Sequence, residues 1–506
     1  MNEVTRRRVS FAATLVALNI LVHFVPFERP GFQPDDYVWR HLSTDPSTGA
    51  FNTAGLTQGI RPLGSTLFMA IPFVFGLNEP AQLAILIATT SLLTVLAYLY
   101  LDGLLGESTA ALASLIFVLW PVKHELYGSQ LMAVVTTAGC LILAAGLTFR
   151  RWMQRGERSF LLAAVLLYTA SILTYEIGYL APLVFYWFER EGSEENRRGA
   201  ALFAIPAVLY WILRWARPEA PFTIGRHDLS LDGLADGLVS LPSNLLGFQA
   251  ARNMAYGLFG VWSASTALQA FAAAIAAVVA LLSRRLRRRS DENRETLDSS
   301  WWRTTAGALG VAVLLMAPAA MVLVESRQSV LSAIAMGVAL CATLFRLPRM
   351  ATAGVAALLA FASMGLAFRQ AQLSAIQAAV ASSLTTRAKT LELAETVVID
   401  LETLSSRIDY TWGDARTNGL RSYWGLPAFG PGGFAYMVED AVSPMAGTKR
   451  RRVLVCAAGL SRADGKIRCE REIRGRRFEV RDENAVIVDF SSLPLPDAIA
   501  RRPPAS

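Results

Sequence analysis

Charge is scarce in this sequence: 17% of its 506 residues are charged, whereas 53% are hydrophobic, and the mean hydropathy is +0.37. Soluble globular proteins usually carry about 25% charged residues. The composition therefore excludes an ordinary soluble protein and indicates a polytopic membrane protein.

Motifs of several enzyme classes are absent as well. The chain has four cysteines and four histidines, and none of them shows zinc-site spacing. It contains no GxxxxGK(S/T) phosphate-binding loop, no GxSxG nucleophile elbow and no internal repeat. These absences argue against ATP-driven pumps, zinc enzymes and serine hydrolases.

The net charge of +8 comes from short basic clusters between apolar runs, at residues 5–8, 150–155 and 284–289. Nucleic-acid binding is not indicated, because positive clusters that flank membrane spans follow the positive-inside rule. We interpret the clusters as cytoplasmic anchors that also contact anionic membrane lipids.

Long apolar runs dominate the remaining sequence. The first, Val9 to Val25, follows a basic flank but precedes no small-residue cleavage site, which favours a retained signal anchor. Applying the length of a membrane span predicts an all-α polytopic membrane protein with about eleven transmembrane helices, at residues 9–27, 81–101, 108–122, 131–149, 159–175, 177–188, 199–215, 261–283, 304–324, 328–345 and 350–368.

The basic clusters also predict the topology. All of them fall on the cytoplasmic side if residues 62–77 lie in the membrane interface without crossing and residues 159–188 cross twice, turning at Tyr175–Glu176. The N-terminus is then cytoplasmic and the C-terminus periplasmic or extracellular, in what we expect to be a bacterial inner membrane.

From Arg369 onward the composition is that of a soluble domain. Alternating runs at 451–459, 466–472 and 476–490, the last broken at Asp482–Asn484, predict short strands. We therefore expect a membrane module at 1–368 and a small outer domain with β structure at 369–506. Cys456 and Cys469 on neighbouring strands could form a disulfide or remain as two buried thiols.

The topology places most polar residues of interest on the outer face. Asp35 and Asp36 could be catalytic carboxylates or an ordinary helix N-cap after Pro34. Arg327, near Glu325, and Arg61 could bind a phosphate or extend their side chains to the membrane interface.

Two further outer segments carry ionisable residues. Lys123, His124 and Glu125 could contact a substrate or form a solvated turn. Glu176 lies in a tight turn between two apolar spans, where an ionisable residue is a functional-site hypothesis by default.

The order of these segments resembles one enzyme family. DDY (35–37), RPLGSTLFMAIPFVFGLN (61–78), FVLWPVKHELYGS (117–129), YEIGYLAPL (175–183) and VESRQS (324–329) follow one another as in GT-C type polyprenyl-phosphate-dependent glycosyltransferases. Within these, the sequence is most similar to the protein O-mannosyltransferase branch and its tetratricopeptide-bearing relatives. The resemblance covers about the first 370 residues.

The sequence departs from that branch at three points. Trp120 replaces the usual histidine before Pro121, one residue separates Glu325 from Arg327, and the C-terminal region has no tetratricopeptide pattern.

The resemblance implies transfer of a sugar from a polyprenyl-phosphate-linked donor to a hydroxyl group on a protein, lipid or glycan acceptor at the outer face. Asp35 is then the general base, and Asp36 positions substrate groups or holds a divalent metal. Arg327 contacts the donor phosphate. The remaining substrate-binding residues implied are Arg61, Lys123, His124, Glu125 and Glu176.

Two other classes of protein also fit a basic polytopic chain. A transporter or flippase of lipid-linked sugars usually has repeated halves and charged groups near the membrane midplane, whereas the acidic residues here cluster at one face. A non-catalytic membrane partner, binding another protein through the outer domain, is the third reading.

Overall fold

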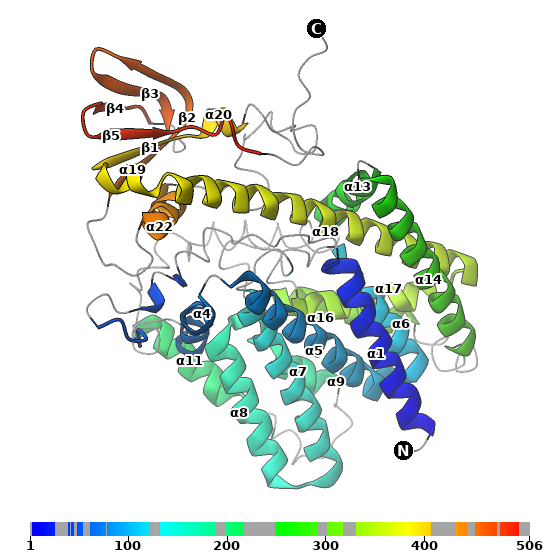
Figure 1. Cartoon of the computed structure of the whole chain (residues 1–506). Helices are drawn as coiled ribbons and strands as arrows, with labels where there is room; N and C mark the ends of the chain where they lie inside the picture. The colour runs from blue at the N-terminus through cyan, green and yellow to red at the C-terminus, as the bar shows by residue number, and fades with distance from the viewer. Residues whose placement is uncertain are drawn as a thin grey trace. The chain divides into compact units, whose positions relative to one another are not determined.

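A computed structural model of the chain is shown in Figure 1. It describes residues 3–25, 39–40, 42–44, 48–53, 61–76, 78–121, 127, 132–188, 199, 201–216, 248–262, 264–290, 301–316, 330–405, 431–442, 451–472 and 476–494. The described residues are mostly helical, with a small sheet near the C-terminus, which confirms the predicted combination of apolar helices and a C-terminal β structure.

The chain divides into two compact units. The first comprises Met1–Pro26, Thr53–Leu67 and Ala84–Phe368, and the second comprises Phe27–Asn52, Phe68–Leu83 and Arg369–Ser506. The predicted domains, 1–368 and 369–506, stay a prediction.

The apolar region of the chain forms a series of helices, most of them at the expected positions. They are α1 (Glu3–His23), α4 (Pro62–Phe75), α5 (Glu79–Leu105), α6 (Glu107–Val118), α7 (Met132–Arg155), α8 (Arg158–Thr174), the 3-10 helix η2 (Glu176–Gly178), α9 (Ala181–Phe188), α11 (Ala204–Ala216), α13 (Phe248–Trp262), α14 (Thr266–Ser290), α16 (Trp301–Met316), α17 (Val330–Leu344) and α18 (Arg349–Thr386).

Four of the described helices are long and apolar enough to cross a membrane: Pro80–Leu105, Met132–Arg155, Thr266–Ser290 and Arg349–Thr386. Shorter apolar helices accompany them. The chain is therefore an integral membrane protein, while the number of eleven crossings and their directions stay predictions.

Glycines separate consecutive helices where the chain needs a left-handed backbone. Gly106 (φ 81°) lies between α5 and α6, and Gly156 (φ 71°) lies between α7 and α8, which pack side by side as a helical hairpin. Residues with a Cβ rarely adopt such angles, so these two glycines determine where the helices turn.

Helix α6 is enclosed by other helices in the described part of the first unit. All residues from Thr109 to Val118 are buried, and the helix packs against α1, α14 and α17. A helix that is apolar on every side needs other helices around it, and α6 accordingly lies inside the bundle.

Two of the basic residues that we interpreted as lipid-contacting anchors are buried instead. Arg150 is 9% exposed and donates a hydrogen bond to the Tyr100 carbonyl oxygen. Arg287 is 3% exposed and donates to the carbonyl oxygen of Phe345, just past the end of α17. These two arginines join neighbouring helices, because a buried guanidinium needs acceptors. The Phe345 carbonyl group lies beyond the end of a helix, where carbonyl groups lack partners within the helix.

The last apolar helix is longer than predicted. We expected a span at 350–368, but α18 continues to Thr386. The sequence from Arg369 to Thr386 is rich in Ala and Gln and contains neither Gly nor Pro. Helix propensity therefore persists where the hydropathy falls, and a change in polarity did not mark the helix end.

The C-terminal sheet has the strand order β4-β3-β2-β1-β5. Its strands are β1 (Thr396–Asp400), β2 (Arg452–Ala463), β3 (Lys466–Glu472), β4 (Phe478–Arg481) and β5 (Ala485–Val488), and the accompanying helices are α19 (Ala388–Leu393), α20 (Leu401–Ser405) and α22 (Pro431–Val442). β1 is parallel to β2 and β5, whereas β2, β3 and β4 are successively antiparallel.

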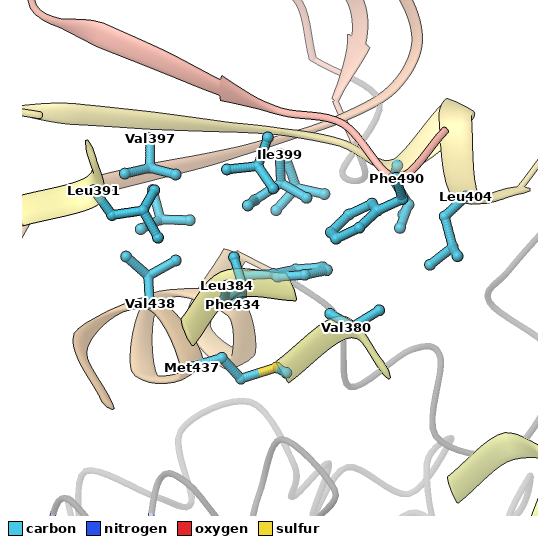
Figure 2. Close-up of a cluster of buried hydrophobic side chains, with 14 of the residues drawn as sticks. Val380, Leu384, Leu391, Val397, Ile399, Leu404, Phe434, Met437, Val438 and Phe490 are labelled. Atoms are coloured by element: carbon cyan, nitrogen blue, oxygen red, sulfur yellow. The ribbon is translucent and has the colours of Figure 1, made fainter. Parts of the chain in front are cut away.

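The core of the second unit lies between the sheet and the helices. Figure 2 shows Val397 and Ile399 of β1 facing Leu384 of α18 and Phe434 of α22. On the other face of β1, Val398 packs in a second apolar cluster. A central strand buried on both faces reads as a continuous apolar run.

A disulfide joins Cys456 of β2 to Cys469 of β3. It resolves the alternative left open by the sequence in favour of pairing. Cys140 and Cys341 are free and buried in the helical unit.

Candidate functional site

The turn between α8 and α9 forms one side of the candidate site. α8 ends at Thr174, Tyr175 is extended (φ −161°, ψ 136°), and η2 begins at Glu176. The break therefore falls at the predicted Tyr175–Glu176 position.

Side-chain hydrogen bonds hold this turn in place. The Tyr168 hydroxyl donates to the Tyr179 carbonyl oxygen at 2.8 Å, and Ser171 Oγ donates to the Ala138 carbonyl oxygen at 2.8 Å. The Tyr179 hydroxyl reaches the Ala207 carbonyl oxygen of α11 at 3.0 Å. The backbone around Glu176 is thus tied to α7, α8 and α11.

Arg61 and Glu176, two of the predicted site residues, form a bidentate ion pair. Arg61 Nε and Nη2 donate to the two carboxylate oxygens of Glu176. The side chains are only 22% and 12% exposed, and the Arg61 guanidinium lies 4.1 Å from the centroid of the Tyr175 ring. Planar bidentate pairing and ring stacking together fix the guanidinium orientation.

The electrostatics of this pair limit what Arg61 can do. Burial lowers the pKa of Arg61, but the charge of the Glu176 carboxylate, the hydrogen bonds to it and the neighbouring Tyr175 and Tyr210 together outweigh burial, so the pKa is raised above its ordinary value. A guanidinium has five N–H donors, and two are used here, which leaves three for an anion. Since the pair is neutral overall, strong phosphate binding needs a further cation.

A close backbone contact joins the start of α4 to the same turn. A Cβ added to Gly64 would lie 2.0 Å from the Thr174 carbonyl oxygen. Only glycine permits this approach. Gly64 therefore allows the segment after Arg61 to pack directly against the end of α8.

An apolar cavity of about 330 Å³ lies within the first unit, lined by residues of α5, α7, α9, α16 and α17. Ala181 of α9, close after η2 in sequence, is one of its lining residues, and Ile142 and Leu331 are others. Its volume is within the range of small-molecule sites, and its lining suits a hydrocarbon chain.

The other predicted site residues lie outside the described residues: Asp35, Asp36, Lys123, His124, Glu125 and Arg327. Their proximity to Arg61 and Glu176 stays a prediction. Within the part of the chain that the structure describes, no group of three or more His, Cys, Asp or Glu side chains could hold a metal ion. Asp36, the metal ligand considered from the sequence, is not among those residues.

Sequence reasoning missed Tyr175 and Gly64 as parts of this site. Both lie within motifs that carried the resemblance, RPLG and YEIG, so the motifs were the available signal. Trp120, where the resembling enzymes have histidine, is buried at the end of α6.

No protein-family model and no curated protein matches the sequence. Among solved structures, the chain is similar to the crystal structure of ArnT from Cupriavidus metallidurans in the apo state, with 13% sequence identity and a TM-score of 0.37. The similarity covers 90% of this chain and 87% of that chain. A score of this size does not establish a common fold.

Proposed function

We propose that this chain is a membrane glycosyltransferase of GT-C type. It transfers a sugar from a polyprenyl-phosphate donor to a hydroxyl acceptor at the outer face of its membrane. The observation that carries the proposal is the Arg61–Glu176 ion pair. These residues lie 115 positions apart. Each was predicted as a site residue from a different motif of the resemblance.

In this mechanism, Asp35 removes the proton of the acceptor hydroxyl as the sugar is transferred, a contribution typically worth about 10²- to 10⁴-fold in rate. Asp36 orients the acceptor or binds a divalent cation. Arg327 supplies the cation that the neutral Arg61–Glu176 pair lacks. Glu176 orients Arg61, whose remaining N–H groups donate to the phosphate that leaves with the polyprenyl chain.

The apolar cavity is our candidate location for part of the polyprenyl chain. A polyprenyl donor must keep its hydrocarbon in an apolar environment while its phosphate meets cations. The cavity lining includes the first residue of α9, the helix that follows η2, which supports this placement.

The disulfide supports an outer location for the second unit. Structural disulfides persist in oxidising compartments and are rare in the cytosol. The Cys456–Cys469 bond therefore agrees with a periplasmic or extracellular C-terminus.

Mass spectrometry of cell-envelope proteins and glycolipids, with and without the gene, tests the function. We expect a sugar to be missing from one class of acceptor in the absence of the gene, while its polyprenyl-phosphate donor accumulates. Unchanged envelope glycans would contradict the proposal. A flippase would instead leave the donor on the cytoplasmic side of the membrane, which donor accessibility in oriented vesicles distinguishes.

A further inference from the structure

The WPVKHE motif follows the end of α6, where backbone carbonyl groups need hydrogen-bond donors. The helix ends at Val118, and the motif begins at Trp120. The final carbonyl groups of a helix have no partner within it. Inside a membrane protein, such groups need partners from elsewhere in the fold.

Three side chains from three other helices supply hydrogen bonds to this segment. The bonds run from His23 Nε2 to the Val118 carbonyl oxygen (2.8 Å), from Ser363 Oγ to the Leu119 carbonyl oxygen (2.7 Å) and from Asn253 Nδ2 to the Pro121 carbonyl oxygen (3.4 Å). All three donors are at most 3% exposed. Since a carbonyl oxygen only accepts, the proton of His23 is on Nε2.

A crossing of small residues brings two of these donors together. A Cβ added to Gly257 of α13 would lie 2.0 Å from the Ala362 carbonyl oxygen, and one added to Gly365 of α18 would lie 1.7 Å from the Gly257 carbonyl oxygen. The two backbones are therefore in direct contact. Asn253 is one helical turn before Gly257, and Ser363 is adjacent to Ala362, whose carbonyl oxygen Gly257 approaches, so the two helices that carry these donors are in contact.

His23 also holds the far end of the motif segment. Its ring is stacked on Tyr127, with centroids 3.8 Å apart and an interplanar angle of 4°. The Tyr127 hydroxyl donates to Asn19 Oδ1 at 3.2 Å, and Asn19 Nδ2 donates to Thr90 Oγ1 at 3.2 Å. A buried polar chain from α1 and α5 thus reaches Tyr127.

We propose that His23, Asn253 and Ser363 form a clamp that fixes the backbone at residues 118–121, with Tyr127 held at the other end. Lys123, His124 and Glu125 lie between these two fixed points in sequence, and we expect sugar transfer to depend on the backbone that the clamp holds. The clamp residues touch no reacting atom in this proposal and are positioning residues. The substrate-contact part rests on the proposed function.

Variants that separate hydrogen bonding from packing test the clamp. His23→Phe keeps a ring to stack on Tyr127 but removes the donor, whereas His23→Gln keeps an N–H donor. Ser363→Ala removes the hydroxyl from α18. Thr352→Val is the matched control, because Thr352 on the same helix is fully buried and donates to the Leu344 carbonyl at the end of α17 (3.2 Å).

Hydrogen exchange of peptides covering 119–131 reports the clamp without any substrate. We expect faster exchange there in His23→Phe and Ser363→Ala, and unmodified rates in His23→Gln and Thr352→Val. If exchange at 119–131 is unchanged in both His23→Phe and Ser363→Ala, or rises equally in Thr352→Val, the clamp is refuted.

Transfer from undecaprenyl-phosphate mannose to membranes of cells lacking the protein tests the catalytic part. We expect kcat to fall roughly 10- to 100-fold in His23→Phe and Ser363→Ala, the cost of a small misplacement, with KM for the donor within about 3-fold of normal. His23→Gln should restore most of kcat. Faster exchange with normal kcat would refute the positioning role. Absence of mannose transfer by the unmodified protein would count against this donor, and hydrogen exchange would then decide the clamp.

Discussion

Arg61 donates two hydrogen bonds to Glu176 and stacks on Tyr175, so the start of α4 is fastened to the turn between α8 and α9. Both partners are largely buried. This pair therefore has a structural role in addition to the catalytic role that we propose, and the two roles need separate tests.

Hydrophobic replacement separates these roles. Glu176→Ala leaves the Arg61 charge uncompensated and should lower the free energy of unfolding by about 3 kcal/mol, whereas Arg61→Met with Glu176→Met should be neutral to within roughly 1 kcal/mol. If Arg61 contacts the donor phosphate, the double variant should still lose undecaprenyl phosphate binding. Unfolding in detergent and a binding assay measure both effects; normal binding by the stable double variant would remove Arg61 from the site.

The Gly64 contact predicts a position-specific effect of alanine. Gly64→Ala places a methyl group against the Thr174 carbonyl oxygen and should destabilise the protein by about 1–3 kcal/mol. Gly310→Ala in α16, where an added Cβ meets no atom within 4 Å, should stabilise it by about 0.5–1 kcal/mol. Equal melting temperatures for the two variants would show that α4 does not pack against the α8 end in this way.

The disulfide should stabilise the C-terminal sheet. The bond closes a loop between residues separated by 13 positions, for which a contribution of roughly 3 kcal/mol is expected. Cys456→Ser with Cys469→Ser should therefore unfold the sheet at lower denaturant concentration. Alkylation of unreduced protein from cells should leave both cysteines unmodified, and labelling of either one would contradict an oxidised outer domain.

Topology can be tested at two well-defined places. Alkaline phosphatase fused after Ser506 should be active, because we place the C-terminus in the periplasm. The same enzyme inserted at Gly156, in the turn between α7 and α8, should be inactive, because we place that turn in the cytoplasm. Activity at Gly156, or inactivity at Ser506 with normal protein levels, would contradict the charge-based topology.

Sequence patterns predicted the helices and strands that depend on nearby residues. Apolar runs located most helices, and alternation located β2 and β3. The sequence also predicted the break at Asp482–Asn484 between β4 and β5. β1 was not predicted, because a central strand buried on both faces is a short apolar run without alternation. The end of α18 was missed because helix propensity continues beyond the apolar residues.

The site was predictable only residue by residue. Arg61 and Glu176 were each selected by motif, but nothing in either segment says that they pair, since that depends on the packing of distant helices. Asn253 and Ser363 are similar in this respect, because a polar residue in a helix shows no local sign of the distant carbonyl group to which it donates a hydrogen bond.

The rate of sugar transfer by purified Asp35→Asn protein tests the central claim most directly. Asparagine keeps the size of the side chain and removes its basicity, so undecaprenyl phosphate binding should persist while transfer falls at least about 10²-fold. Asp36→Asn, measured in parallel, should reduce the chemical step less. Near-normal transfer by Asp35→Asn would contradict its assignment as the base, and near-normal transfer by both variants would contradict the glycosyltransferase mechanism proposed for this chain.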